Sequence, residues 1–219
     1  MPVEEGGLLI RDYNQLAGRG LERIWNLSDS VFAFALTLLV LNVRLPDAGA
    51  IHGEAELLGA LVRLWPRAAT YLMSFLALGI FWVNQQTQHN LMARSDRNAA
   101  WLHLVFLALV VFVPVSTNLL TEFGAYRTAM ILYWLNFVML GFAFLAAWTY
   151  AVRAGLLKAE VDPDMVAAVY RRVLVGQVLF ALGAALCVFG TVWSIGFTVL
   201  VLLNYAIAPR ILWLRRLTA

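Results

Sequence analysis

The residues with the clearest chemical potential lie in one apolar stretch near the start of the chain. Ser28 and Asp29 open this stretch, and Thr37 places one hydroxyl near its middle. An ionisable side chain costs roughly 2.5 to 3.5 kcal/mol at the centre of a membrane helix, so Asp29 indicates a function or a buried partner. Ser and Asp also cap free N–H groups in the first turn of a helix, and this alternative stays open from the sequence.

Other reactive side chains are scattered. His52 falls in a connection, His89 in a cytoplasmic break and His103 in a later apolar segment, with no second ligand at a spacing typical of zinc. Cys187 is the single cysteine, so neither a disulfide framework nor a set of thiolate ligands is possible. No Ser-His-Asp or Cys-His set can be placed on one membrane face. We therefore expect no metal, no cofactor and no enzymatic activity.

The composition indicates an integral membrane protein. Hydrophobic residues make up 62% of the 219 residues and charged residues 13%, where soluble domains have about 25% charged residues. The formal net charge is +3, but the 16 basic residues lie in the short breaks between apolar runs. They are typical of topology signals, so we do not expect nucleic acid as a partner.

A helix needs about 20 mostly apolar residues to cross a bilayer. This criterion predicts an all-α, polytopic protein with one transmembrane domain over residues 1–219 and six spans. The expected spans are 27–45, 65–83, 99–120, 129–152, 173–190 and 191–208.

The basic residues also predict the orientation, because cytoplasmic loops carry an excess of Lys and Arg. Twelve of the 16 fall in the amino-terminal segment, the second and fourth connections and the tail; the other face has only Arg44, Arg63, Arg67 and Arg127. We therefore expect both termini to be cytoplasmic.

Helical spacing sorts the first apolar segment into faces. Ser30, Phe34, Thr37, Leu38 and Leu41 share one stripe along it. If several copies of this helix met around an axis, the stripe would line a path narrowed by Phe34 and Leu41. A stripe of Leu and Phe is also typical of ordinary helix packing, so the spacing by itself does not define a pore.

Two sequence blocks resemble the prokaryotic transmembrane protein 175 family of potassium-conducting channels. The first is Arg23, then Leu27-Ser28-Asp29, then Phe32 to Leu41, ending at Leu45-Pro46. The second contains Trp65-Pro66, Tyr71 to Phe75 and Gly79 to Asn84, followed by Asp96 and Trp101. Together they cover about a third of the chain in matching order, and six spans is the subunit size of the prokaryotic members.

The resemblance implies a homotetramer in a prokaryotic inner (plasma) membrane, with a potassium-selective leak pore lined by the first helix and without a re-entrant pore loop. It places the hydrophobic constriction on Phe34, Leu38 and Leu41, selectivity on Thr37, and a signature network on Arg23, Ser28, Asp29 and Trp82. Ser30 would lie at the wide pore mouth. Thr37 could instead bond back to the carbonyl of Ala33, a common habit of threonine in membrane helices.

Three positions depart from the family pattern. Leu27 replaces phenylalanine before Ser-Asp, Gln85 replaces a histidine three residues after Trp82, and Phe34 is bulkier than the usual Ile or Leu. A network that relies on imidazole must therefore be rebuilt around an amide. The alternative function is a small six-helix secondary transporter. Such a carrier is expected to show repeats with matching broken helices, and Pro114 has no counterpart in the sixth segment.

Overall fold

The computed structural model describes residues 20–186 and 191–207, and regular structure in these ranges is helical apart from one isolated bridge between Met92 and Leu157. The predicted all-α class is therefore confirmed. The elements are α2 (Leu21–Leu39), η1 (Val40–Asn42), η2 (Ala48–Ala50), α3 (Glu54–Arg63), α4 (Trp65–Leu91), α5 (Arg97–Phe123), α6 (Arg127–Arg153), α7 (Pro163–Ala185) and α8 (Thr191–Ile207).

Within residues 20–186 and 191–207, five helices are long and apolar enough to cross a membrane: α2 with η1, α4, α5, α6 and α7. The sixth expected span, 191–208, corresponds to α8, whose 17 residues would measure about 26 Å at 1.5 Å per residue. That length is at the lower limit for a span. Residue 208 of this span, and residues 187–190 at the end of the fifth expected span, lie outside the described residues.

Several helices begin earlier than the positions that the apolar runs predicted. Helix α2 begins at Leu21 instead of residue 27, and α7 begins at Pro163 instead of residue 173. Asp162 starts α7 by accepting a hydrogen bond from the Asp164 N–H at 3.0 Å, with Pro163 in the first turn. Polar residues extend a helix beyond the hydrocarbon region, whereas hydropathy detects only the part that suits lipid. The predicted spans therefore began too late at these ends.

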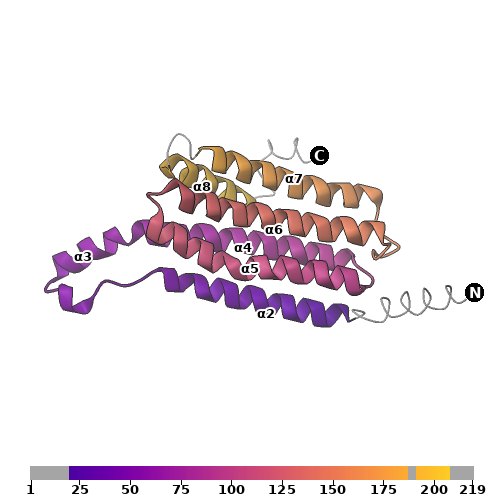
Figure 1. The fold of residues 1–219 in the computed structure, drawn as a ribbon, viewed down its shortest axis with the longest axis horizontal. Helices are drawn as coiled ribbons and strands as arrows, with labels where there is room; N and C mark the ends of the chain where they lie inside the picture. Colours follow the sequence, from indigo (N-terminus) through magenta and orange to yellow (C-terminus); the bar gives the residue numbers. More distant parts are fainter. Residues whose placement is uncertain (1–19, 187–190, 208–219) are drawn as a thin grey trace, which may run out of the picture.

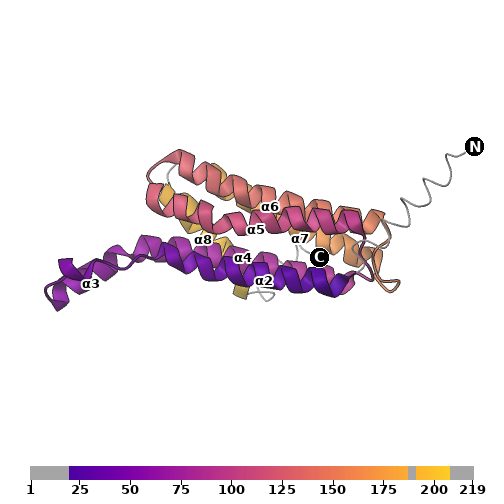
Figure 2. The same cartoon turned by 60° about the horizontal axis from the view of Figure 1, so that its bottom comes forward.

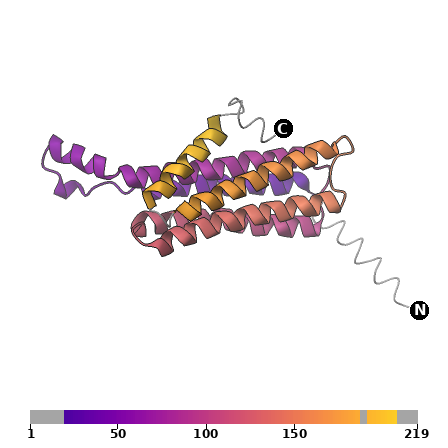
Figure 3. The same ribbon diagram turned by 90° about the horizontal axis from the view of Figure 1, so that it is seen from above.

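The long helices form an elongated bundle (Figure 1). Helices that follow one another in the chain also pack together: α5 packs along α6, and α6 along α7. Helix α2 packs against α5 and α4, while α8 contacts α4 and α7 and runs obliquely to the other helices (Figure 3). Helix α2 lies at the margin of the bundle (Figure 1 and Figure 2), so the other described helices cover only one of its faces.

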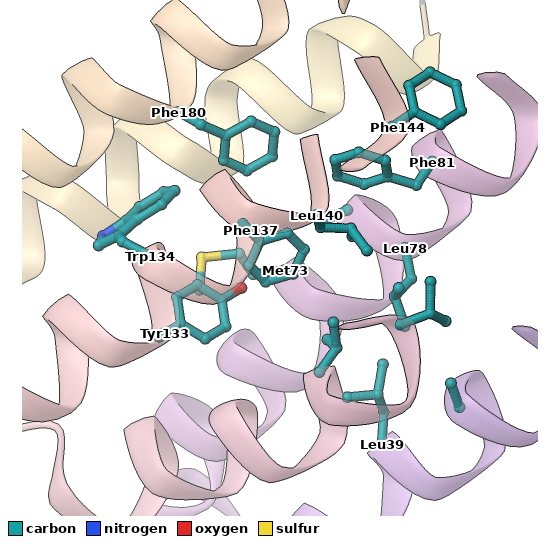
Figure 4. Packing of buried hydrophobic residues seen from close by; sticks show 14 of the residues in the cluster. Leu39, Met73, Leu78, Phe81, Tyr133, Trp134, Phe137, Leu140, Phe144 and Phe180 are labelled. Atoms are coloured by element: carbon teal, nitrogen blue, oxygen red, sulfur yellow. The ribbon is translucent and has the colours of Figure 1, made fainter. Parts of the chain in front are cut away.

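Aromatic side chains from several helices fill the core (Figure 4). The Phe137 ring of α6 stacks on Phe180 of α7 with centroids 5.7 Å apart, and Phe81 of α4 meets Phe144 edge to face at 6.1 Å. Offset and edge-to-face pairs are the preferred arrangements of aromatic rings. This interdigitation sets how α4, α6 and α7 are rotated against one another.

Small polar side chains add hydrogen bonds between buried helices. Ser74 of α4 contacts the Tyr133 hydroxyl of α6 at 3.1 Å, and the Thr117 hydroxyl of α5 donates to Ser74 at 2.8 Å. The Asn136 amide of α6 donates to the Ser116 hydroxyl of α5 at 3.0 Å. Such bonds hold membrane helices together where apolar burial gives little driving force.

The connection between the first two spans contains a helix that the sequence did not predict. The ten-residue α3 projects from the end of the bundle, beyond the start of α4 (Figure 1). At ten residues it is too short to span a bilayer, so a criterion of about 20 consecutive apolar residues does not detect it. It leaves Leu58 and Val62 exposed.

Candidate functional site

The candidate site is the uncovered face of α2. Phe34 is 72% exposed in the subunit, Leu41 66% and Leu38 45%, and Ser30 and Thr37 are exposed on the same face. All five residues of the predicted stripe therefore lie together on the side of α2 that the subunit leaves open.

The opposite face of α2 anchors the helix. Phe32, Ala35 and Leu39 are buried in the main hydrophobic core, and the Phe32 ring lies 6.0 Å from that of Phe106 on α5. These residues repeat at three- and four-residue intervals, as one face of a helix must. The packing of this face sets the rotation of α2 and directs Phe34 and Thr37 away from the core.

The two hydroxyls of the stripe bond back to their own helix. Thr37 Oγ1 donates to the Ala33 carbonyl at 2.7 Å, and Ser30 Oγ donates to the Asn26 carbonyl at 2.7 Å. A hydroxyl has one donor and two acceptor lone pairs. Donation to the backbone uses the hydrogen and leaves the lone pairs of the exposed oxygens available to a cation.

Asp29 links α2 to α4. Its Oδ1 accepts a hydrogen bond from Trp82 Nε1 at 2.9 Å and another from Gln86 Nε2 at 3.0 Å. The interpretation that Asp29 caps the first turn is wrong, because α2 begins at Leu21 and Asp29 is its ninth residue. Two donors from one helix hold the carboxylate by charge-assisted bonds.

Sequence reasoning missed Gln86 as a partner of Asp29. Gln86 lies four residues after Trp82, so the two side chains share a face of α4. That spacing was the signal that could have found it.

The other two members of the expected network are placed differently. Ser28 is fully buried, and its hydroxyl has no hydrogen-bond partner within the described ranges. Arg23 is exposed in the first turn of α2, and no ion pair with Asp29 is found in residues 20–186 or 191–207. The structure therefore brings together Asp29 and Trp82 but not all four residues.

Gln85, at the position where the resemblance predicts a histidine, contacts a different imidazole. Its Nε2 lies 3.0 Å from His103 Nε2, and the His103 ring is 5.4 Å from that of His89. His89 stacks on Trp25 of α2 at 5.2 Å.

His89 lies inside α4, which continues through its polar end to Leu91, and not in a break between helices as the sequence predicted. Across the described part of the chain, no three His, Cys, Asp or Glu side chains converge as a metal site would require.

These features define a helical integral membrane protein whose first span is anchored by one face and open on the other. Sequence comparison identifies the family. The profile described as "Endosomal/lysosomal potassium channel TMEM175" matches residues 23–114. A potassium channel of Streptomyces collinus is 36% identical over 191 residues, covering 85% of this chain and 84% of the relative. The chain belongs to the TMEM175 family.

Two further relatives agree with this assignment. A potassium channel of Chamaesiphon minutus is 33% identical over 190 residues, covering 84% of this chain and 93% of the relative. The crystal structure of a lysosomal potassium-selective channel TMEM175 homolog from the same organism superposes with a TM-score of 0.72 at 29% identity, covering 85% of this chain and 96% of that chain. The expected family is thereby confirmed.

Proposed function

We propose that this protein is a potassium-selective leak channel, not an enzyme, and that four copies surround a central pore lined by α2. The observation that carries the proposal is the uncovered stripe of α2, which combines exposed Phe34 and Leu41 with a hydroxyl at Thr37. Relatives that are named potassium channels support the choice of ion.

One α2 helix cannot enclose an axial path, so the pore requires several copies in a closed ring. In this arrangement the stripe faces the axis, and the side chains that would face lipid in an isolated subunit form the pore wall. Helix α8 serves as the sixth span, and both termini lie on the cytoplasmic side of the prokaryotic plasma membrane.

The constriction is formed by Phe34, Leu38 and Leu41. Their side chains offer an ion no ligands, so a narrow ring of them is dry and closed and must widen and hydrate to conduct. Thr37 lies between Phe34 and Leu41, where a ring of hydroxyl oxygens could replace part of the ion's water shell. Ser30 lies toward the mouth. The contact between Asp29 and Trp82 holds this half of α2 against α4, and Arg23 and Ser28 precede it on α2.

Planar-bilayer recording of the purified full-length protein tests the proposal. Under a potassium gradient we expect discrete single-channel currents that reverse near the potassium equilibrium potential. Native mass spectrometry of the same preparation should give four chains. Coupled, saturable flux without unitary currents would favour a carrier, and a preparation that contains only monomers or dimers would remove the basis for the pore.

A further inference from the structure

A charged cluster joins three helical elements at the end of the bundle from which α3 projects. Glu122, next to the last residue of α5, faces Arg67 in the first turn of α4 and Arg44, which follows η1. Arg67 Nη2 donates to Glu122 Oε2 at 3.3 Å, and Arg44 Nη1 lies 3.8 Å from Glu122 Oε1. Each carboxylate oxygen therefore faces a different guanidinium.

The three side chains differ in how far they reach outward. The Arg44 side chain is 66% exposed, whereas those of Arg67 and Glu122 are 31% and 27% exposed. Arg67 thus holds Glu122 against the bundle. The other oxygen of Glu122 faces Arg44, the more exposed of the two guanidinium groups.

Arg44 lies close to the end of the α2 stripe. It follows Leu41 by three residues, so the two Cα atoms are at most about 11 Å apart. In an assembly with α2 around the axis, Leu41 is the last stripe residue at this end, and the Arg44 side chains form a ring at the adjoining mouth.

We propose that Glu122 tunes permeation by offsetting the charge of Arg44 at this mouth, a step that rests on the proposed pore-lining role of α2. Each cluster has two cations and one anion. Loss of the carboxylate would raise the net charge of each cluster from +1 to +2, and this would occur in every subunit. Rings of charged side chains at a channel mouth set the local concentration of permeant ions, so uncompensated Arg44 would deplete potassium there.

The effect of Glu122 on potassium permeation must depend on the salt concentration. The Debye length is about 30 Å at 0.01 M ionic strength and about 3 Å at 1 M. Charges at the mouth therefore act across the pore opening at low salt and are screened at high salt. A change in pore width would instead persist at both concentrations.

The test measures unitary conductance in planar bilayers with potassium chloride at about 0.01 M and about 1 M. For potassium entering from the Arg44 side, we expect Glu122→Gln to lower conductance roughly twofold or more at low salt and to match the wild type at high salt. Arg44→Gln should raise conductance at low salt. The control is Arg127→Gln, which removes a cation at the same end of the bundle, at the start of α6.

The outcomes separate this inference from the function on which it rests. A wild-type protein that carries no current contradicts the pore itself. A conducting wild type whose low-salt conductance equals that of both Glu122→Gln and Arg44→Gln overturns the inference alone, as does an equal change in Arg127→Gln. If Glu122→Gln does not assemble, Arg44→Gln decides, because it keeps the Arg67–Glu122 pair.

Discussion

The carboxylate of Asp29 accepts the Trp82 indole N–H at 2.9 Å, and this contact fixes the third turn of α2 against the middle of α4. An acid that hydropathy places in an apolar span thus has donors from a neighbouring helix. Gln86 adds the second at 3.0 Å. The residue positions the helix whose other face forms the candidate pore lining.

Trp82→Phe should destabilise the subunit by removing the indole donor while keeping an aromatic ring. We expect a loss of about 1.5 kcal/mol, the low end for a hydrogen bond to a charged acceptor, because Asp29 is exposed. Thermal unfolding of the protein in detergent measures it. Trp101→Phe, the same change at an exposed tryptophan of α5, is the control. Equal stability of Trp82→Phe and the wild type would show that the indole contact contributes nothing.

Phe34→Ser and Leu41→Asn should raise basal potassium current, because a polar ring lowers the cost of hydrating the constriction. Macroscopic current per reconstituted channel is the measurement. The matched control is Phe112→Ser, since Phe112 of α5 is also strongly exposed, at 53%. If all three variants carry the wild-type current, the α2 stripe faces lipid or protein and not the pore.

Thr37→Ala should lower the potassium-to-sodium permeability ratio. The Thr37 hydroxyl donates to Ala33 and keeps its lone pairs free, so a ring of these oxygens can replace water around potassium more readily than around the more tightly hydrated sodium ion. Reversal potentials under bi-ionic conditions measure the ratio. Ser30→Ala, which removes an equivalent hydroxyl nearer the mouth, should change it little. An unaltered ratio in Thr37→Ala would assign selectivity to pore width or to another residue.

Gly141→Ala should weaken the contact between α6 and α7. A Cβ at this position would collide with the amide of Gln177 on α7. Overpacking costs about 1 to 3 kcal/mol, and we expect the low end, about 1 kcal/mol, because the Gln177 amide ends a flexible side chain that can move aside. Thermal unfolding should show the loss, and the double variant with Gln177→Ala should recover most of it. Gly79→Ala is the control, since its Cβ would meet no atom within 4 Å. Failure of Gln177→Ala to restore stability would contradict the proposed clash.

The sequence by itself determined the class, the family and the position of the apolar helices. The lipid bilayer restricts the local sequence strongly, because each spanning helix must be a long, apolar segment that makes its own backbone hydrogen bonds. That requirement is visible in the runs that contain Phe34, Phe81 and Phe137. The three- and four-residue spacing of Ser30, Phe34, Thr37 and Leu41 likewise fixed which residues share a face, since the geometry of a single helix is known in advance.

Only the tertiary structure decided which polar side chains meet. Whether Asp29 caps its own helix or bonds Trp82 and Gln86 depends on where α2 begins and how it is rotated against α4. The same holds for Glu122, which is 78 residues from Arg44 in the chain yet faces its guanidinium. Hydropathy measures transfer from water to lipid one residue at a time. The pairing of side chains is set by packing between helices, which depends on the fit of rings such as Phe81, Phe137 and Phe180.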